Sequence, residues 1–351
     1  MRILLGMSGG LDSTYAALKL ASEGHSVEGA VVVMHEHTEI DAAKTAADGL
    51  GIPLHVINRE ELFRERVVDY FVSEYTSART PNPCVVCNSD VKFRVLYDYA
   101  IEHGFDMIAT GHYAKINRID TSSGVRYALS VAADSKKDQT YMLWRLPQDI
   151  LSKLYLPLSD LNKEQIRKDA REHNVSAADR EESQEICFIP SGDYASFIEE
   201  RTFLSKRGKF IDESGNVLGE HQGIIRYTVG QRKGLGIAMG QRVFVTNIDP
   251  VANTVTLSAS DSYSDTVEVT DMVFSAIAEP NPNEEIKLFV KLRYLAPRIP
   301  CTVLYRGSGV ATVTLNTAQR AVTPGQSAVF YDEFGTLIAG GFISSSLQKQ
   351  G

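Results

Sequence analysis

A short apolar stretch, a loop of serine and glycine, and a helix start open this chain and constrain its fold more than any other feature. Residues 2–7 have the composition of a buried strand, and residues 14–24 show helical spacing of apolar side chains. The string between them, at residues 8–13, is Ser-Gly-Gly-Leu-Asp-Ser. Glycines let a backbone approach an anion, and free N–H groups at a helix N-terminus point at it. The pattern predicts either a phosphate-binding turn or a plain tight turn whose helix is capped by Asp12 or Ser13.

This loop is not a Walker loop, because no Lys follows the glycines in GK[ST] order. It resembles the pyrophosphate loop, SGGxDS, of adenylating ATP pyrophosphatases, which cleave ATP between the α- and β-phosphates and attach AMP to a substrate oxygen. The resemblance implies ATP and Mg²⁺ as cofactors, with Asp12 reaching the metal ion and Ser13 a phosphate oxygen. It does not name the substrate that is activated.

Strands and helices alternate as far as residue 110, which predicts a parallel sheet with helices on both faces. Ligands bind outside the carboxyl ends of the strands in such sheets. That edge would collect residues 8–13, Met34 and Gly111 in one place.

Beyond residue 191 the sequence consists of short runs in which apolar and polar residues alternate, separated by turn residues. This pattern predicts a small β-rich domain and then a β-barrel. We therefore expect three domains. They are an α/β ATP pyrophosphatase domain of the adenine-nucleotide α-hydrolase type at 1–203, a small basic β-rich domain at 204–270, and a C-terminal β-barrel at 271–351.

The 351 residues carry a formal net charge of −8, which argues against indiscriminate nucleic-acid binding. Residues 201–245 nevertheless contain eight basic side chains against three acidic ones. We interpret this stretch as a surface that contacts phosphate backbone, with a solvated loop face as the alternative. The sequence contains no apolar run of about 18 residues and no leader-like segment, so we expect a cytoplasmic protein without a membrane span.

Four cysteines are too few for a disulfide framework and are more typical of catalysis, metal binding or simple burial. Cys84 and Cys87 lie in Thr80–Asn88, where prolines predict a stiff loop rather than a helix. Cys87 precedes a helical stretch, whose dipole would lower the pKa of its thiol. Three interpretations compete: a redox CxxC pair, a zinc site, and sulfur transfer with a persulfide on Cys187 and Cys87 as acid or resolving thiol.

Seven strings along the chain together resemble the bacterial tRNA-specific 2-thiouridylase family. In order they are SGGLDS, TPNPxxxCN, ATGHYA, KKDQTYML, SQEICFIP, YTVGQRKGLGI and TPGQSAVFY. The matching stretches run in family order from residue 3 to about residue 342, so the resemblance covers nearly the whole chain. It implies 2-thiolation of the wobble uridine in tRNAs for Lys, Glu and Gln, with a sulfur-donor protein or another persulfide source as partner.

The family's functional residues can be carried over position by position. The resemblance implies that Cys87 is the nucleophile and Cys187 the persulfide-bearing cysteine. Contacts to ATP are implied at Gly6, Met7, Ser8, Gly9, Gly10, Leu11, Asp12, Ser13, Met34 and Gly111. Contacts to tRNA are implied at Asn82, Pro83, Cys84, His112, Lys137, Asp138, Gln139, Arg293, Tyr294 and Gln326. Plainer alternatives are a structural hydrogen bond at His112, a helix N-cap at Asp138 and turn chemistry at Gln326.

One position departs from the family pattern, because Cys84 stands where the commonest form has an Asp that acts as an acid–base group. A thiol, with a reference pKa of about 8.5 against about 3.9 for Asp, replaces a carboxylate base near neutral pH only if its pKa is depressed. Alternatively, Cys84, Cys87 and Cys187 hold a [4Fe–4S] cluster with one iron open for sulfur, as in related tRNA thiolases.

The implied chemistry makes AMP a leaving group on carbon 2 of uracil, so that a persulfide or hydrosulfide can attack that carbon. Two other classes fit parts of the sequence. An amidotransferase-type or argininosuccinate-type synthetase would share the loop but have no use for Cys87 and Cys187. A non-enzymatic RNA-binding protein with a redox or iron–sulfur sensor would release no pyrophosphate when tRNA and ATP are supplied.

Overall fold

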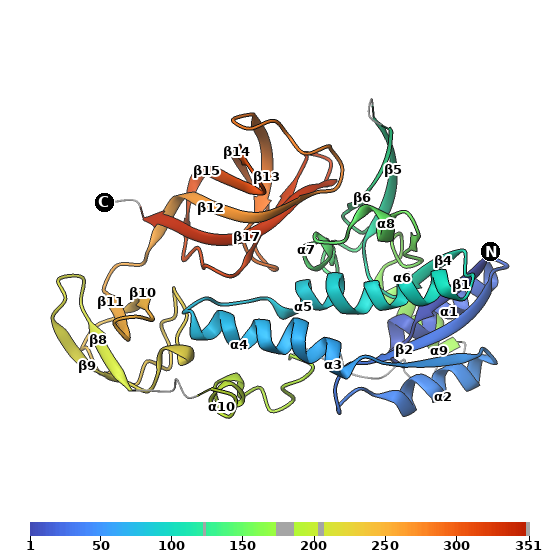
Figure 1. Ribbon diagram of the computed structural model, residues 1–351, viewed down its shortest axis with the longest axis horizontal. Coiled ribbons are helices and arrows are strands. Elements are labelled where there is room, and N and C mark those ends of the chain that lie inside the picture. Colours follow the sequence, from blue (N-terminus) through green and yellow to red (C-terminus); the bar gives the residue numbers. More distant parts are fainter. Residues whose placement is uncertain (122–123, 173–185, 203–206, 349–351) are drawn as a thin grey trace.

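The computed structural model of the protein describes residues 1–121, 124–172, 186–202 and 207–348. Figure 1 shows three parts: a parallel sheet with its helices at one end of the long axis, a small sheet at the other end, and a barrel beside the centre. Within the described ranges, no helix is long and apolar enough to cross a membrane.

The parallel sheet is built around β1 (Arg2–Gly6), the apolar run at the start of the chain. Its order is β3-β2-β1-β4-β7, and every pair is parallel. The other strands are β2 (Ser26–Val33), β3 (Leu54–Asn58), β4 (Met107–Thr110) and β7 (Leu154–Tyr155). Leu4 packs into one apolar cluster and Ile3 and Leu5 into another, because helices cover both faces. The predicted α/β alternation is confirmed.

One face is covered by α1 (Leu11–Ser22), α2 (Ile40–Leu50) and α9 (Lys163–Glu172). Two longer helical segments, each with a π-helical middle turn, cover the other face. The first comprises α3 (Glu60–Phe63), η1 (Arg64–Val68) and α4 (Asp69–Thr76); the second comprises α5 (Pro83–Val86), η2 (Cys87–Lys92) and α6 (Phe93–Glu102). Shorter helices are α7 (Thr140–Leu143), α8 (Gln148–Leu151) and α10 (Tyr194–Glu199).

The small sheet has the order β10-β11-β8-β9. Its strands are β8 (Gly208–Ile211), β9 (Val217–His221), β10 (Phe244–Asp249) and β11 (Thr254–Ser258), with the 3₁₀ turn η3 (Ile224–Arg226) between β9 and β10. A separate antiparallel pair, β5 (Lys115–Thr121) and β6 (Gly124–Ser130), extends from the first part and is not predicted from the sequence.

The barrel closes in the order β12-β15-β14-β13-β16-β17. Its strands are β12 (Tyr263–Phe274), β13 (Glu285–Lys291), β14 (Ile299–Gly307), β15 (Val310–Arg320), β16 (Ser327–Tyr331) and β17 (Leu337–Gln348). The domain boundary expected at 270 falls inside β12. Val267, three residues before that boundary, already pairs with both β15 and β17 of the barrel. The boundary expected at 203 lies outside the described residues.

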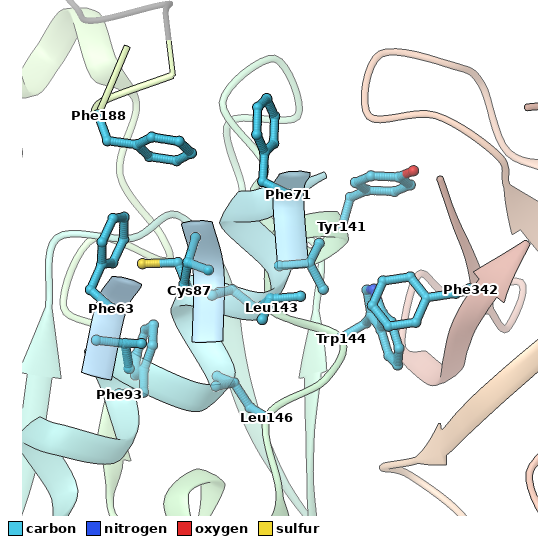
Figure 2. Packing of buried hydrophobic residues seen from close by; sticks show 14 of the residues in the cluster. Phe63, Phe71, Cys87, Phe93, Tyr141, Leu143, Trp144, Leu146, Phe188 and Phe342 are labelled. Carbon is cyan, nitrogen blue, oxygen red and sulfur yellow. The ribbon is translucent and has the colours of Figure 1, made fainter. Parts of the chain in front are cut away.

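The barrel is packed firmly onto the first part through Trp144 (Figure 2). The indole N–H donates to Ser327 Oγ at 2.9 Å, and the ring meets Phe342 edge-on at 5.2 Å between centroids. A Cβ at Gly340 would lie 2.5 Å from the same ring, so this position has room only for glycine. One apolar cluster therefore continues from the helices around Cys87 into the barrel.

Candidate nucleotide and thiol site

The Ser-Gly loop closes on itself through its two serines. Ser8 N–H donates to Ser13 Oγ at 3.2 Å, and the Ser13 hydroxyl donates to the carbonyl of Gly10 at 3.1 Å. Gly10 is the N-cap of α1 and makes no side-chain cap hydrogen bond. The predicted capping by Asp12 or Ser13 is wrong, because both lie inside the first turn.

Two glycines hold the loop where a side chain would not fit. Gly9 has φ of 73°, and a Cβ there would lie 2.6 Å from the carbonyl oxygen of Ala42 in α2. Gly111 follows β4, and a Cβ there would lie 2.9 Å from Ser13 N. The loop and Gly111 thus meet at the carboxyl edge of the sheet, where parallel sheets bind ligands.

Asp12 is held by two side chains that no sequence pattern singles out. Lys163 Nζ lies 2.6 Å from both carboxylate oxygens, and the hydroxyl of Tyr113 donates to Oδ1 at 2.6 Å. Lys163 is only 6% exposed and begins α9, directly after Asn162, whose Oδ1 accepts the N–H of Glu164. A cation in the first turn opposes the helix dipole. Lys163 therefore stands where the dipole of its own helix disfavours a cation, and its partner Asp12 lies 151 residues away along the chain.

The remaining residues implied to contact the nucleotide differ in burial and in their place on the sheet. Met7 and Leu11 are buried in the core, so only their backbone can face a ligand. Gly6 ends β1. Met34 follows β2, and its sulfur lies 3.6 Å from the Sγ of Cys87. Met34 therefore connects the loop edge of the sheet to the helix that carries the cysteines.

Cys84 and Cys87 lie in a continuous helix that begins at Pro83, which corrects the predicted loop. Proline is accepted at the first helical position because the missing N–H has no intrahelical partner there. Asn82 is the N-cap, and its Oδ1 accepts the N–H of Cys84 at 3.2 Å. Cys84 is exposed, whereas Cys87 lies a turn further in and is 7% exposed.

The predicted lowering of the Cys87 pKa is wrong. Burial raises the pKa of this thiol to about 12, and the charge of Lys92 opposes the rise only in part. Desolvation of the thiolate outweighs the helix dipole because Cys87 lies past the first turn and among apolar side chains.

Cys187 lies over the same helix. Residues 183–185 of its motif are outside the described residues, but Cys187 itself is exposed, and Phe188 beside it is buried. The Phe188 ring meets Phe63 and Phe71 at 5.5 Å each, in the apolar cluster that contains Cys87 (Figure 2). Burial raises the pKa of Cys187, and the neighbouring Cys84 thiol raises it further. The segment that carries Cys187 thus packs through Phe188 on the same apolar cluster that buries Cys87.

The described arrangement does not fit a [4Fe–4S] cluster on these cysteines. Across the residues that the structure describes, no three His, Cys, Asp or Glu side chains are placed to hold a metal ion together. No reaction step below uses a cluster.

Short-range and long-range internal hydrogen bonds hold Asp138, Gln139 and His112, three of the implied tRNA contacts. Asp138 accepts the Thr140 hydroxyl at 2.7 Å and the N–H of Ala132 at 3.2 Å, and it is not an N-cap, since Gln139 holds that position before α7. Gln139 Oε1 accepts the N–H of Tyr113 at 2.9 Å.

The third, His112, has its Nδ1 2.9 Å from Thr110 Oγ1. Burial lowers the pKa of His112 to about 3, so the imidazole is neutral.

Arg293 and Gln326 line a cavity of about 330 Å³ where the three parts meet. Gln326 Nε2 donates to the carbonyl of Thr80 at 2.8 Å, and Arg293 donates to the carbonyl of Ala321. The other lining residues are Thr228, Val229, Gly230, Gln231 and Thr323. Thr80 stands just before the Asn82 cap, so this cavity opens at the start of the cysteine helix.

The basic stretch at 201–245 keeps exposed charge. Arg226 is paired with Glu199 at 2.6 Å, and Lys206 lies outside the described residues. Exposed basic residues of the stretch are Arg201, Arg207, Lys209, Arg232, Lys233 and Arg242.

A glycine loop between β1 and α1, at the ligand-binding edge of a parallel sheet, defines an α/β protein with a site for a phosphate-bearing ligand. Three family models match in succession: a tRNA methyl transferase HUP domain at residues 1–191, a tRNA methyl transferase PRC-barrel domain at 195–259, and an aminomethyltransferase beta-barrel domain at 264–343. The expected fold class is confirmed, including ATP use by the first domain.

Full-length relatives narrow this class. The chain is 42% identical to a tRNA-specific 2-thiouridylase MnmA of Carboxydothermus hydrogenoformans, over 99% of this chain and 98% of that protein. It is 41% identical to that of Acetivibrio thermocellus, over 97% and 98%, and 39% identical to that of Clostridioides difficile, over 99% of each. The chain belongs to the tRNA-specific 2-thiouridylase MnmA family.

Proposed function

We propose that this protein is a tRNA-uridine 2-sulfurtransferase. It adenylates the carbon-2 oxygen of the wobble uridine in tRNAs for Lys, Glu and Gln, and replaces that oxygen with sulfur, releasing AMP and pyrophosphate. The observation that carries the proposal is the Met34–Cys87 contact, which brings the Cys87 thiol to the end of β2, at the edge of the sheet that also holds the glycine loop. A synthetase that shares only the loop would have no use for this connection.

The loop fits ATP, because Gly9 and Gly111 keep side chains away from the backbone that would face the phosphates. We assign Mg²⁺ to Asp12, since this ion is commonly held by one or two carboxylates together with substrate phosphates. When bound, it supplies charge neutralisation to the departing pyrophosphate. Lys163, already paired with Asp12, adds a second positive charge at the same point.

Cys187 is assigned as the sulfur carrier because it is exposed and accessible to a persulfide-donating protein. Its terminal persulfide sulfur attacks carbon 2 of the adenylated uracil. A C–S bond forms, the C–O bond to AMP breaks, and the persulfide proton is lost to solvent. Cys87 then attacks the Sγ of Cys187 as it gives up its proton, a Cys87–Cys187 disulfide forms, and the sulfur on carbon 2 leaves with the electron pair as the thiocarbonyl of 2-thiouridine. An external thiol reduces the disulfide and supplies the two electrons. We place the reaction in the cytoplasm, where a reducing environment keeps the other thiols available.

The target base has to leave its stack to reach these groups. We propose base contacts at Asn82, Pro83 and Cys84, and further tRNA contacts at Lys137, Arg293, Tyr294 and Gln326. His112, Asp138 and Gln139 shape the wall behind them through hydrogen bonds to Thr110, Thr140 and Tyr113. The exposed basic residues of the small-sheet part hold the phosphate backbone, so binding weakens as salt rises.

The test is one reaction with ATP, Mg²⁺, a tRNA transcript and a persulfide source, in which AMP and 2-thiouridine are both measured. We expect them in equal amounts, and neither with a transcript whose wobble uridine is replaced by cytidine. Cys187→Ser should release pyrophosphate on adenylation but form no 2-thiouridine, because nothing displaces AMP from carbon 2. A protein that releases no AMP when the correct tRNA is supplied is not this enzyme.

A further inference from the structure

The helix that carries Cys84 and Cys87 contains a wide turn directly after the second cysteine. This π-helical turn, η2, runs from Cys87 to Lys92 and joins α5 to α6. A π turn holds one residue more than an α turn, and such turns often mark functional sites. Because successive residues of an α-helix are rotated by about 100°, loss of the extra residue would turn the helix start by that angle relative to α6. The direction of the Cys87 thiol towards Met34 therefore depends on this turn.

The middle of the π turn is bound to α7 and to the residues that follow α7. Asn88 Nδ2 donates to the carbonyl of Met142 at 3.1 Å. Arg145 Nη1 donates to both carboxylate oxygens of Asp90, at 2.8 and 2.7 Å, and to Ser89 Oγ at 3.1 Å. The side chains of Arg145 and Asp90 are 30% and 29% exposed, so solvent screens their ion pair only in part.

The residues that bind the π turn are also fixed on the barrel. Trp144, the residue before Arg145, is buried against the barrel (Figure 2). Its indole contacts Ser327 and Phe342. The guanidinium carbon of Arg145 itself lies 6.0 Å from the centroid of the Phe342 ring. Ser327 directly follows Gln326, one of the proposed tRNA contacts, so a continuous set of packed residues joins the barrel to the π turn.

We propose that Arg145 is a positioning residue for Cys87. By binding Asp90 and Ser89, Arg145 keeps the π turn wide and so keeps the Cys87 thiol in place for its attack on Cys187. Cys87 is 7% exposed and packed in an apolar cluster, so its thiol has little freedom to change direction by itself. The direction that the helix gives this thiol therefore sets how often the attack succeeds.

This inference rests on the proposed function, in which Cys87 frees the sulfurated nucleoside from Cys187. Arg145 acts on that one step, and only through the geometry of the helix. Adenylation takes place at the glycine loop between β1 and α1, so it should not depend on Arg145. The two steps can therefore be measured separately in one reaction.

The experiment is a single turnover without reductant, using protein that carries a persulfide on Cys187, together with ATP, Mg²⁺ and a tRNA transcript. Pyrophosphate, free 2-thiouridine and the disulfides of the protein are followed over time. Arg145→Gln should release pyrophosphate at the wild-type rate but form free 2-thiouridine and the Cys87–Cys187 disulfide roughly 10- to 100-fold more slowly. Its nucleoside should stay on Cys187 until dithiothreitol is added. Arg145→Lys, which keeps a donor for Asp90, should restore most of the rate.

Further variants test the same contact from its other side and supply a control. Asp90→Ala should show the defect of Arg145→Gln, and the double variant should be no slower than either single variant. Arg94→Gln is the matched control, because Arg94 lies in α6, beyond the π turn, and donates to Asp149 at 2.9 Å. It should match the wild type in every step. Iodoacetamide should label Cys87 faster in Arg145→Gln than in the wild type, while urea unfolding shows that each variant is folded.

Three results would overturn the inference. The first is release of 2-thiouridine by Arg145→Gln at the wild-type rate, and the second is an equal loss from Arg94→Gln. The third is loss of pyrophosphate release in Arg145→Gln, because the contact would then support the whole domain rather than one thiol. Absence of pyrophosphate or 2-thiouridine from the wild type would instead overturn the proposed function.

Discussion

Replacing Gly9 by alanine tests whether the loop geometry is required for nucleotide binding. Gly9 has φ of 73°, and a Cβ there would lie 2.6 Å from both the carbonyl oxygen of Ala42 and the N of Ala43. A left-handed conformation costs an L-residue roughly 1–2 kcal/mol. Forcing an extra carbon against the backbone of α2 adds about 1–3 kcal/mol. If the loop shifts to relieve this strain, a cost of about 2 kcal/mol appears as roughly 30-fold weaker ATP binding.

The adjacent residue provides a matched control. Gly10 has φ of −79°, and a Cβ there would meet only Ser8 Oγ, at 3.3 Å. Gly10→Ala should therefore cost less than about 1 kcal/mol, chiefly through a poorer N-cap. The assay is ATP binding by calorimetry together with urea unfolding. Wild-type affinity and stability in Gly9→Ala, or equal damage from both variants, would refute the reasoning.

Three further predictions follow from single contacts. Lys163→Met leaves the Asp12 carboxylate, one-third exposed, without its cation. The free energy of unfolding in urea should fall by about 1–2 kcal/mol and AMP release should be lost; normal AMP release would remove Lys163 from the site. Gly325→Ala places a Cβ 2.8 Å from Thr80 N at φ of 90°, whereas at Gly240, where φ is 67°, a Cβ meets nothing within 4 Å. Gly325→Ala should therefore lower the free energy of unfolding by about 1–3 kcal/mol more than Gly240→Ala. Equal effects would show that the backbone at Thr80 moves away without cost. The pKa of His112 in the folded protein, about 3, lies below the usual value for an unfolded chain. As the pH drops below about 6.5 the unfolded state therefore binds a proton that the folded state does not, and the free energy of unfolding falls. His112→Gln should lose less stability than the wild type between pH 6.5 and 4.5, and an identical decline would contradict a buried neutral imidazole.

The nucleotide edge of the fold is predictable from local sequence. The loop at 8–13 needs only its two glycines and the neighbouring apolar run to specify a strand, a turn and a helix. The barrel and small sheet follow from period-two runs bounded by turn residues. The loop and the strands depend on residues close to one another along the chain, so the sequence alone is enough to predict them.

The cysteine region shows where local patterns fail. Pro83 was expected to exclude a helix, yet it occupies the one position where its missing N–H costs nothing. The pKa of Cys87 depends on Phe63, Phe71 and Phe188, which come from distant segments and bury the thiol. No reading of the CxxC string alone could supply that burial.

The ion pair of Asp12 with Lys163 and the Gln326–Thr80 hydrogen bond are also long-range contacts. They join residues 151 and 246 positions apart, so only the packed structure reveals them. The start of the barrel at Tyr263 likewise depends on pairing with β15 and β17, because an isolated run of residues does not show which sheet it joins.

The central claim is that the oxygen on carbon 2 of the wobble uridine leaves with AMP. A tRNA carrying ¹⁸O at that one position, incubated with the protein, ATP, Mg²⁺ and a persulfide source, tests it directly by mass spectrometry of the AMP. The account predicts one ¹⁸O in the AMP phosphate for each 2-thiouridine formed. Unlabelled AMP accompanying 2-thiouridine would contradict it.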